Sequence, residues 1–331
     1  FALGDPLGQG RRWLGHSPAL GLLVSLWESR QLGRAADLAA RWLDLTLAAG
    51  LQDREGAVLR PTDDLRAHGP EPVALLEQNA SFLEVLAAAI AALQHADLPA
   101  RAADLAAFMR SRLWHPAGGF VHAWGCLGAP DGSEGGQPSG RVLDSRRFVG
   151  ANAIAVRAWI QAQAVIAART VGDVVSRTLE SVLTPAFSAG SGVMACMDEQ
   201  TSVRLLAPQL QAADGYLAVF NATGQTVYLD LAHEVVLAAL RDFADPATRL
   251  LRDRVPMAHD ETARLAEPMT SAVDNALAVR LLVRIGVSRT QPELLDHARG
   301  LLQACRAILP AEPQDWAHHL AAWHELTSAD S

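Results

Sequence analysis

Apolar residues recur every three to four positions in long stretches, and short polar turns separate these stretches. Leu20, Leu23 and Leu26 follow this spacing, which is typical of the buried face of an α-helix. The stretches come in pairs joined by a short turn, so a helix–turn–helix unit is repeated along the chain. The expected helices are one that begins at Ser17 and those over 34–49, 73–94, 99–114, 146–169, 173–183, 216–222, 227–240, 271–285, 293–308 and 314–326.

Repeated helical hairpins predict an all-α fold in which the hairpins form a ring. Residues 1–16 are expected to be an irregular lead-in, and 17–331 a single helical domain. Long connectors rich in glycine and proline follow the second helix of a pair. In a ring, they would gather at one rim, around the mouth of a central cavity. These connectors are 51–69, 115–141, 188–214 and 249–268.

A carboxamide interrupts the apolar face near the start of three expected inner helices. Asn79, Asn152 and Asn275 each lie about one turn into such a helix, and Gln78 and Asp274 immediately precede two of them. A buried amide without a partner costs about 1–3 kcal/mol, so these groups must be hydrogen-bonded. Two kinds of partner fit the sequence, a ligand in the cavity or a neighbouring helix or mouth loop.

The composition excludes several classes of function. The 331 residues carry a net charge of −8, which offers no basic face for nucleic acid. No apolar run approaches the roughly 20 residues of a bilayer span, so we expect no direct membrane span. Lysine is absent, which excludes a Schiff-base lysine and a P-loop. A cytoplasmic location is the default expectation, and because position 1 is Phe1, an N-terminal targeting segment remains an alternative.

The densest cluster of titratable residues comprises Asp63, Asp64, His68 and Glu71, in the first connector and at the start of the next helix. Two carboxylates with separated pKa values can act as general acid and base on a glycosidic bond or a sugar ring, and Asp64 and Glu71 are the candidates. The alternative is structural. An aspartate can form the turn, and Glu71 would then sit favourably at a helix N-terminus.

Trp124, in the second connector, is a candidate for stacking on a sugar, although such a tryptophan more often belongs to the core. The spacings of histidine and cysteine match no metal motif, and the glycine motifs of nucleotide sites do not occur. We therefore expect neither a metal ion nor a cofactor.

Several motifs resemble the helical part of the thioredoxin-domain-containing family that includes the spermatogenesis-associated proteins. Residues Arg60 to Asp64 and Leu75 to Ala80 resemble its arginine–aspartate segment and its following Asp-Asn-Ala helix. Gly118-Gly119-Phe120, then Phe220 to Gly224, then Ala272 to Asn275 are similar to later motifs in the same order. The resemblance implies an (α/α)6 toroid of the six-hairpin glycosidase and sugar-epimerase type.

The chain also departs from that family in its titratable residues. Where the family has His-Phe-Glu-Lys, this chain has Glu71-Pro72-Val73-Ala74, and the family's thioredoxin domain is absent from the sequence. These losses favour a catalytically degenerate toroid that acts as a binding or assembly subunit with a protein partner. The alternative is a carbohydrate-active enzyme, a sugar isomerase, epimerase or glycoside hydrolase, in which Arg60 orients a sugar-like substrate.

Overall fold

The computed structural model describes residues 17–30, 33–48, 52–59, 73–93, 96–125, 144–199, 204–255, 268–309 and 316–329. Within these ranges the chain is mainly helical, and its short strands form two antiparallel pairs. The contacts within the chain divide it into two compact units. Unit 1 is Phe1–Arg147 with Ala158–Ser181, and unit 2 is Phe148–Arg157 with Val182–Ser331. The prediction of one domain over 17–331 stays a prediction.

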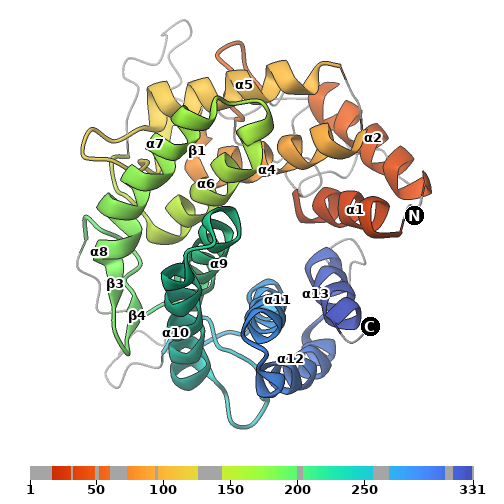
Figure 1. Ribbon diagram of the computed structural model, residues 1–331, viewed down its shortest axis with the longest axis vertical. Helices are drawn as coiled ribbons and strands as arrows, with labels where there is room; N and C mark the ends of the chain where they lie inside the picture. Colours follow the sequence, from red (N-terminus) through yellow and green to blue (C-terminus); the bar gives the residue numbers. More distant parts are fainter. Residues whose placement is uncertain are drawn as a thin grey trace, which may run out of the picture. The chain divides into compact units, whose positions relative to one another are not determined.

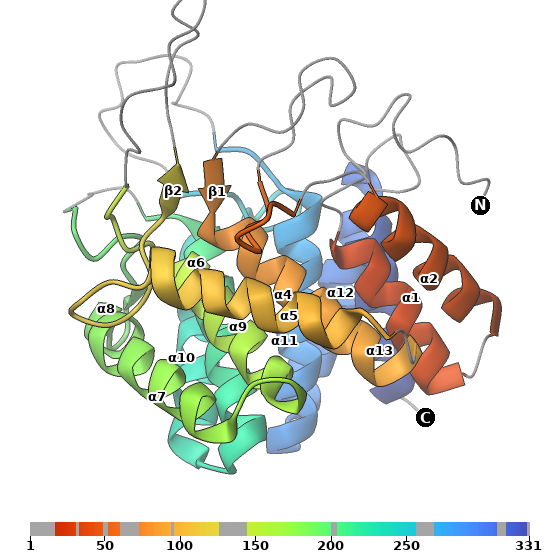
Figure 2. The ribbon, with the colours of Figure 1, turned by 90° about the horizontal axis from the view of Figure 1, so that it is seen from above.

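Unit 1 contains one short pair of strands among its helices. β1 (Val73–Leu75) pairs with β2 (Ala123–Gly125) and leads directly into α4 (Leu76–Leu93), as Figure 2 shows. We expected Val73 to begin the helix, but the pairing with β2 keeps the first three residues extended. The other elements of unit 1 are α1 (Ser17–Arg30), α2 (Gly33–Ala48), α5 (Leu98–Phe108), the π-helix η1 (Met109–Leu113), the 3-10 helix η2 (Ala162–Ala164) and α7 (Ala168–Thr178).

Helix α4 is the most apolar part of unit 1. It packs against α1, α2 and α5, and its buried positions include Leu83 and Leu86, which are fully enclosed. Among the described residues, α4 is the one helix with the length and composition of a membrane span. A core helix has the same properties, and 44% of this stretch is buried inside the protein.

Helix α6 (Val149–Gln161) begins in unit 2 and ends in unit 1, and the π-helix η3 (Leu179–Leu183) also crosses the boundary. In unit 2, α9 (Leu206–Thr223) packs along α10 (Thr226–Phe243). α11 (Ala272–Arg289) packs along α12 (Pro292–Cys305) and α13 (Ala317–Ala329), and α9 also contacts α11 (Figure 1). Thus α9, α11 and α13 are successive neighbours. The remaining elements are α8 (Thr184–Ala186), β3 (Phe187–Ser188), β4 (Gly192–Val193) and the 3-10 helix η4 (Arg306–Ile308).

Local sequence explains where the helices of unit 2 begin and end. The Ser271 hydroxyl accepts a hydrogen bond from the Asp274 N–H and caps the start of α11. Pro292 occupies the first turn of α12, where no N–H donor is needed. Gly224, with φ of 71°, ends α9 in the left-handed conformation that glycine adopts without strain.

The start of α9 corrects one of our expectations. We predicted a connector over 188–214 and a helix from Tyr216, but α9 begins ten residues earlier, at Leu206. Its first turns contain Gln209 and Asp214, both of which are buried. These two polar residues interrupt the apolar pattern from which the helix would have been predicted. Leu206, Leu210 and Leu217 nevertheless keep the spacing of an apolar stripe.

Candidate functional site

Five of the predicted site residues lie outside the part of the chain that the structure describes. They belong to the predicted acid/base cluster and its neighbouring arginine, and they are Arg60, Asp63, Asp64, His68 and Glu71. Their roles remain predictions.

Asn79 and Asn275 are fully buried and hold the main chain of a connector. The Val58 N–H donates to Oδ1 of Asn79 at 2.9 Å, and Nδ2 of Asn79 donates back to the Val58 carbonyl at 2.9 Å. The Leu251 N–H donates to Oδ1 of Asn275 at 2.8 Å, and Nδ2 of Asn275 donates to the Leu251 carbonyl at 2.9 Å. Nδ2 of each asparagine also donates to the carbonyl four residues earlier. Each amide therefore pairs with both the N–H and the carbonyl of one connector residue, as a neighbouring β-strand would.

Gln209 makes the same two bonds in the helix start that we predicted to be a connector. It accepts from the Val193 N–H at 2.7 Å and donates to the Val193 carbonyl at 2.6 Å. Asn152 is also fully buried, and its Nδ2 donates to the Phe148 carbonyl at 2.9 Å. All four amides occupy the fourth residue of their helix, as the starts of α4, α6, α9 and α11 show. Asn79, Gln209 and Asn275 each fasten a connector residue to a helix start, and Asn152 occupies the same position in its helix.

The other described candidates are Gln78 and Asp274, which immediately precede two of these amides, and Trp124. Oε1 of Gln78 is buried and has no hydrogen-bond partner in the part of the chain that the structure describes. Asp274 is half-buried in the first turn of α11. Trp124, in β2, meets the ring of Phe108 edge-on at 5.6 Å, and the Arg112 guanidinium lies 5.4 Å from its ring centre. Trp124 is therefore in contact with an aromatic ring and with a cationic side chain.

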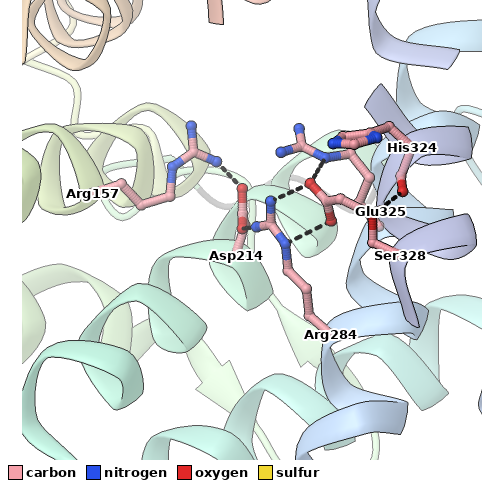
Figure 3. A network of polar contacts seen from close by, with 7 residues as sticks. Arg157, Asp214, Arg284, His324, Glu325 and Ser328 are labelled. Atoms are coloured by element: carbon pink, nitrogen blue, oxygen red, sulfur yellow. Dashed lines mark hydrogen bonds and ion pairs between the residues drawn. The ribbon is translucent and has the colours of Figure 1, made fainter. Parts of the chain in front are cut away.

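A cluster of charged side chains joins α6, α9, α11 and α13 within unit 2, and the sequence did not predict it. Asp214 on α9 is only 5% exposed, and it binds Arg157 of α6 and Arg284 of α11. Figure 3 shows Arg157 and Arg284 reaching Asp214 from two directions. The Arg284 Nη1 to Asp214 Oδ1 distance is 3.0 Å. A carboxylate this buried needs such partners, because an unpaired buried charge is very costly.

Close helix packing brings Arg157 to Asp214. At Gly215 an added Cβ would lie 3.0 Å from the Cβ of Ala153, so the absence of a side chain lets α6 and α9 approach. Arg157 lies one helical turn after Ala153 and therefore on the same face of α6. Asp214 immediately precedes Gly215, so the close approach of the two helices also brings its carboxylate to the guanidinium of Arg157.

Glu325 on α13 is the second carboxylate of this cluster. Arg284 donates to it twice, from Nε at 2.9 Å and from Nη2 at 2.7 Å, and Arg280 donates from Nε at 2.7 Å. Arg280 and Arg284 are one turn apart on α11 and so share a face. Burial alone would raise the pKa of Glu325, but the two arginines outweigh burial and hold this pKa below its ordinary value.

We call Arg157, Asp214, Arg280, Arg284 and Glu325 the charged cluster. Both carboxylates are engaged by guanidinium groups, so neither is well suited to give or take a proton near neutral pH. Guanidinium groups are fixed donors and carboxylates are acceptors, which suits the recognition of a ligand rich in hydroxyl groups. Four of the five side chains keep between 19% and 35% of their surface exposed, which leaves them within reach of a ligand.

The described residues contain no group of three or more histidine, cysteine, aspartate or glutamate side chains that could hold a metal ion. The charged cluster has two carboxylates but no third ligand of this kind.

These elements define an all-α protein of the (α/α)6 toroid, six-hairpin glycosidase-like fold, as the sequence predicted. Cellobiose 2-epimerase from Bacillus thermoamylovorans superposes with a TM-score of 0.71 at 6% identity, over 91% of this chain and 77% of that one. A D-mannose isomerase superposes with a TM-score of 0.62 at 16% identity, over 76% of this chain and 65% of the isomerase. A family 76 glycoside hydrolase, a mannosidase from Bacteroides thetaiotaomicron, superposes with a TM-score of 0.61 at 12% identity, over 84% of this chain and 77% of the mannosidase.

At these identities the likeness concerns the fold. The chain spans about two thirds of the length of the isomerase, 65%. No protein family and no curated protein matches the sequence. The predicted (α/α)6 architecture is thus confirmed, whereas membership of the thioredoxin-domain-containing family stays a prediction.

Proposed function

We propose that this chain is a carbohydrate-active enzyme, a sugar isomerase, epimerase or glycoside hydrolase, that binds its sugar against the charged cluster. The observation that carries the proposal is the position of that cluster on α6, α9, α11 and α13, with most of its side chains still partly exposed. The solved proteins of this fold named above are sugar epimerases, isomerases and mannosidases, which supports the same class of ligand.

The charged cluster would bind and orient the sugar. Its guanidinium groups donate to ring and hydroxyl oxygens, and the carboxylates accept from hydroxyl groups. Proton transfer belongs to other residues in this proposal, because Asp214 and Glu325 are both held by arginines. Asp64 and Glu71 as general acid and base, and Arg60 as an orienting group, remain predictions from the sequence that are independent of the charged cluster.

The assembly-subunit hypothesis was the first one that the sequence favoured, and we now rank it second. It was based on the mainly apolar replacements at Glu71 to Ala74, where the family has His-Phe-Glu-Lys. Among the described residues no feature identifies a protein partner, whereas the fold and the charged cluster both favour a sugar-like ligand.

The test is an assay of the purified chain with D-mannose, cellobiose, an α-1,6-linked mannotriose, D-mannuronate and D-glucuronate, with products resolved by anion-exchange chromatography and NMR. We expect conversion of at least one sugar, which the double change Asp64→Asn and Glu71→Gln abolishes while binding persists. The matched control is Asp296→Asn, which alters an aspartate whose side chain is 75% exposed. Binding without conversion by the unaltered chain would remove the enzymatic part of the proposal, and absence of binding to any sugar would remove it entirely.

A further inference from the structure

The charged cluster contains more positive than negative groups among the described residues. It has three guanidinium groups, on Arg157, Arg280 and Arg284, and two carboxylates, on Asp214 and Glu325. Every carboxylate oxygen already accepts a hydrogen bond from an arginine. Oε1 of Glu325 accepts two of these bonds, so Arg280 and Arg284 share one carboxylate.

Arg280 is an arginine of this cluster with unused donors. Its one hydrogen bond to a described residue runs from Nε to Glu325, so both terminal nitrogens, Nη1 and Nη2, have no such partner. The side chain is 26% exposed, which leaves these nitrogens open to a ligand. Burial and the positive charge of Arg284 lower the pKa of Arg280, and they outweigh the opposing effect of the Glu325 carboxylate.

We propose that the natural sugar carries an anionic group, a carboxylate or a phosphate, which binds the two terminal nitrogens of Arg280. This inference rests on the proposed function, because it names the class of sugar that the same site binds. The planar guanidinium presents paired N–H donors that match a carboxylate or phosphate in a bidentate way. A neutral sugar would bring Arg280 no counter-charge beyond Glu325, whose carboxylate also binds Arg284, and a partly buried charge with little counter-charge is costly.

The first experiment compares three pairs of sugars by isothermal titration calorimetry with the unaltered chain. The pairs are D-mannose with D-mannuronate, D-glucose with D-glucuronate, and D-mannose with D-mannose 6-phosphate. We expect at least one anionic sugar to bind about tenfold or more tightly than its neutral partner, which corresponds to one good charge-assisted contact. The advantage should shrink between about 20 mM and 300 mM NaCl, because salt screens partly exposed charges.

Each outcome separates the inference from the proposed function. If neutral sugars bind as tightly as anionic ones in every pair, the anionic inference is wrong while the sugar-binding function stands. If no sugar of either kind binds, both fail. Inorganic phosphate is titrated in parallel, and binding of phosphate as tight as that of the best anionic sugar would show an anion site without sugar recognition, which also overturns the inference.

The second experiment changes Arg280 itself. Arg280→Gln should remove most of the preference for the anionic sugar, whereas Arg280→Lys, which keeps the charge, should retain part of it. Arg299→Gln is the matched control, because it removes an exposed guanidinium whose ion pair is with Asp296 on the same helix. Thermal unfolding followed by circular dichroism checks that each variant folds, and if Arg280→Gln does not, the salt dependence of the unaltered chain decides. An unchanged preference in a folded Arg280→Gln would overturn the inference.

Discussion

The carboxamide of Asn275 binds both the N–H and the carbonyl of Leu251, 24 residues away along the chain. Asn79 binds Val58 by the same pair of bonds. In each case a connector that precedes the helix is fastened to its first turn. An asparagine at this position thus fixes the path of a connector that would otherwise lack a partner for its buried main chain.

Replacing Asn275 with alanine tests this assignment. The change leaves the N–H and carbonyl of Leu251 without their partner in a buried setting. Each unsatisfied buried group costs about 1–3 kcal/mol, so we expect the free energy of unfolding to fall by about 2–4 kcal/mol. Urea denaturation followed by circular dichroism measures this change.

Asn221→Ala is the matched control for that variant. Asn221 is an exposed residue near the end of α9, and its side chain makes no hydrogen bond to the described part of the chain. Its replacement should change the free energy of unfolding by about 0.5 kcal/mol or less. Equal losses for the two variants would contradict the structural part that we assign to Asn275.

Asp214→Asn is expected to destabilise unit 2 strongly. The change removes the charge that compensates Arg157 and Arg284, and Asp214 is only 5% exposed. Breaking one side of a buried ion pair costs about 3–5 kcal/mol, and the partial exposure of both arginines reduces this to about 2–4 kcal/mol. Asp296→Asn, in an exposed ion pair with Arg299, should cost about 0.5 kcal/mol or less. Denaturation curves that place both variants within error of each other would rule out this role for Asp214.

Acid should destabilise the protein through its paired carboxylates. In the folded chain, the pKa of Glu325 lies below its ordinary value of 4.5. The pKa values of Asp144 and Asp242 likewise lie below the ordinary aspartate value of 3.8. A lowered folded pKa contributes stability that is fully present above the unfolded pKa and is lost as the pH falls through the folded one. We therefore expect the contribution of these groups to be constant from about pH 8 to 5 and to decrease below about pH 4.5.

Glu325→Gln provides the test of the acid prediction. This variant should be less stable at neutral pH and should lose less stability between pH 7 and acid than the unaltered chain. Glu293→Gln, which changes an exposed carboxylate in the first turn of α12, serves as the control. Urea midpoints measured at several pH values compare the three proteins. An acid response of Glu325→Gln as steep as that of the parent would show that Glu325 does not contribute to it.

The helices were predictable where apolar spacing is uninterrupted. Helix α10, the pair α11–α12 and the final helix α13 follow that spacing over most of their lengths. The first ten residues of α9 were missed because buried Gln209 and Asp214 break the stripe. β1 was missed for another reason. Its strand conformation depends on a partner some 50 residues away, Val73 opposite Gly125, and periodicity within one stretch cannot reveal such a partner.

The candidate site was only partly predictable from the sequence. Asn79 and Asn275 could be recognised as polar interruptions of apolar faces, but not their partners Val58 and Leu251, which lie more than 20 residues away. The charged cluster was not predicted because an arginine in a helix is usually exposed to solvent. Only the packing of the helices against one another brings Arg284 to Asp214, 70 residues apart in sequence.

Gly192 and Gly190 give a matched pair for the Gln209 contact with Val193. Both glycines have positive φ, 80° and 69°, so alanine at either position suffers backbone strain of about 1–2 kcal/mol. They differ in their surroundings. A Cβ at Gly192 would lie 2.1 Å from Oε1 of Gln209, whereas nothing lies within 4 Å of a Cβ at Gly190. Gly192→Ala must therefore displace the amide that binds Val193, and we expect it to cost about 2 kcal/mol more than Gly190→Ala. Urea denaturation of both variants measures the difference, and equal losses would mean that Gln209 can move aside without losing its bonds to Val193.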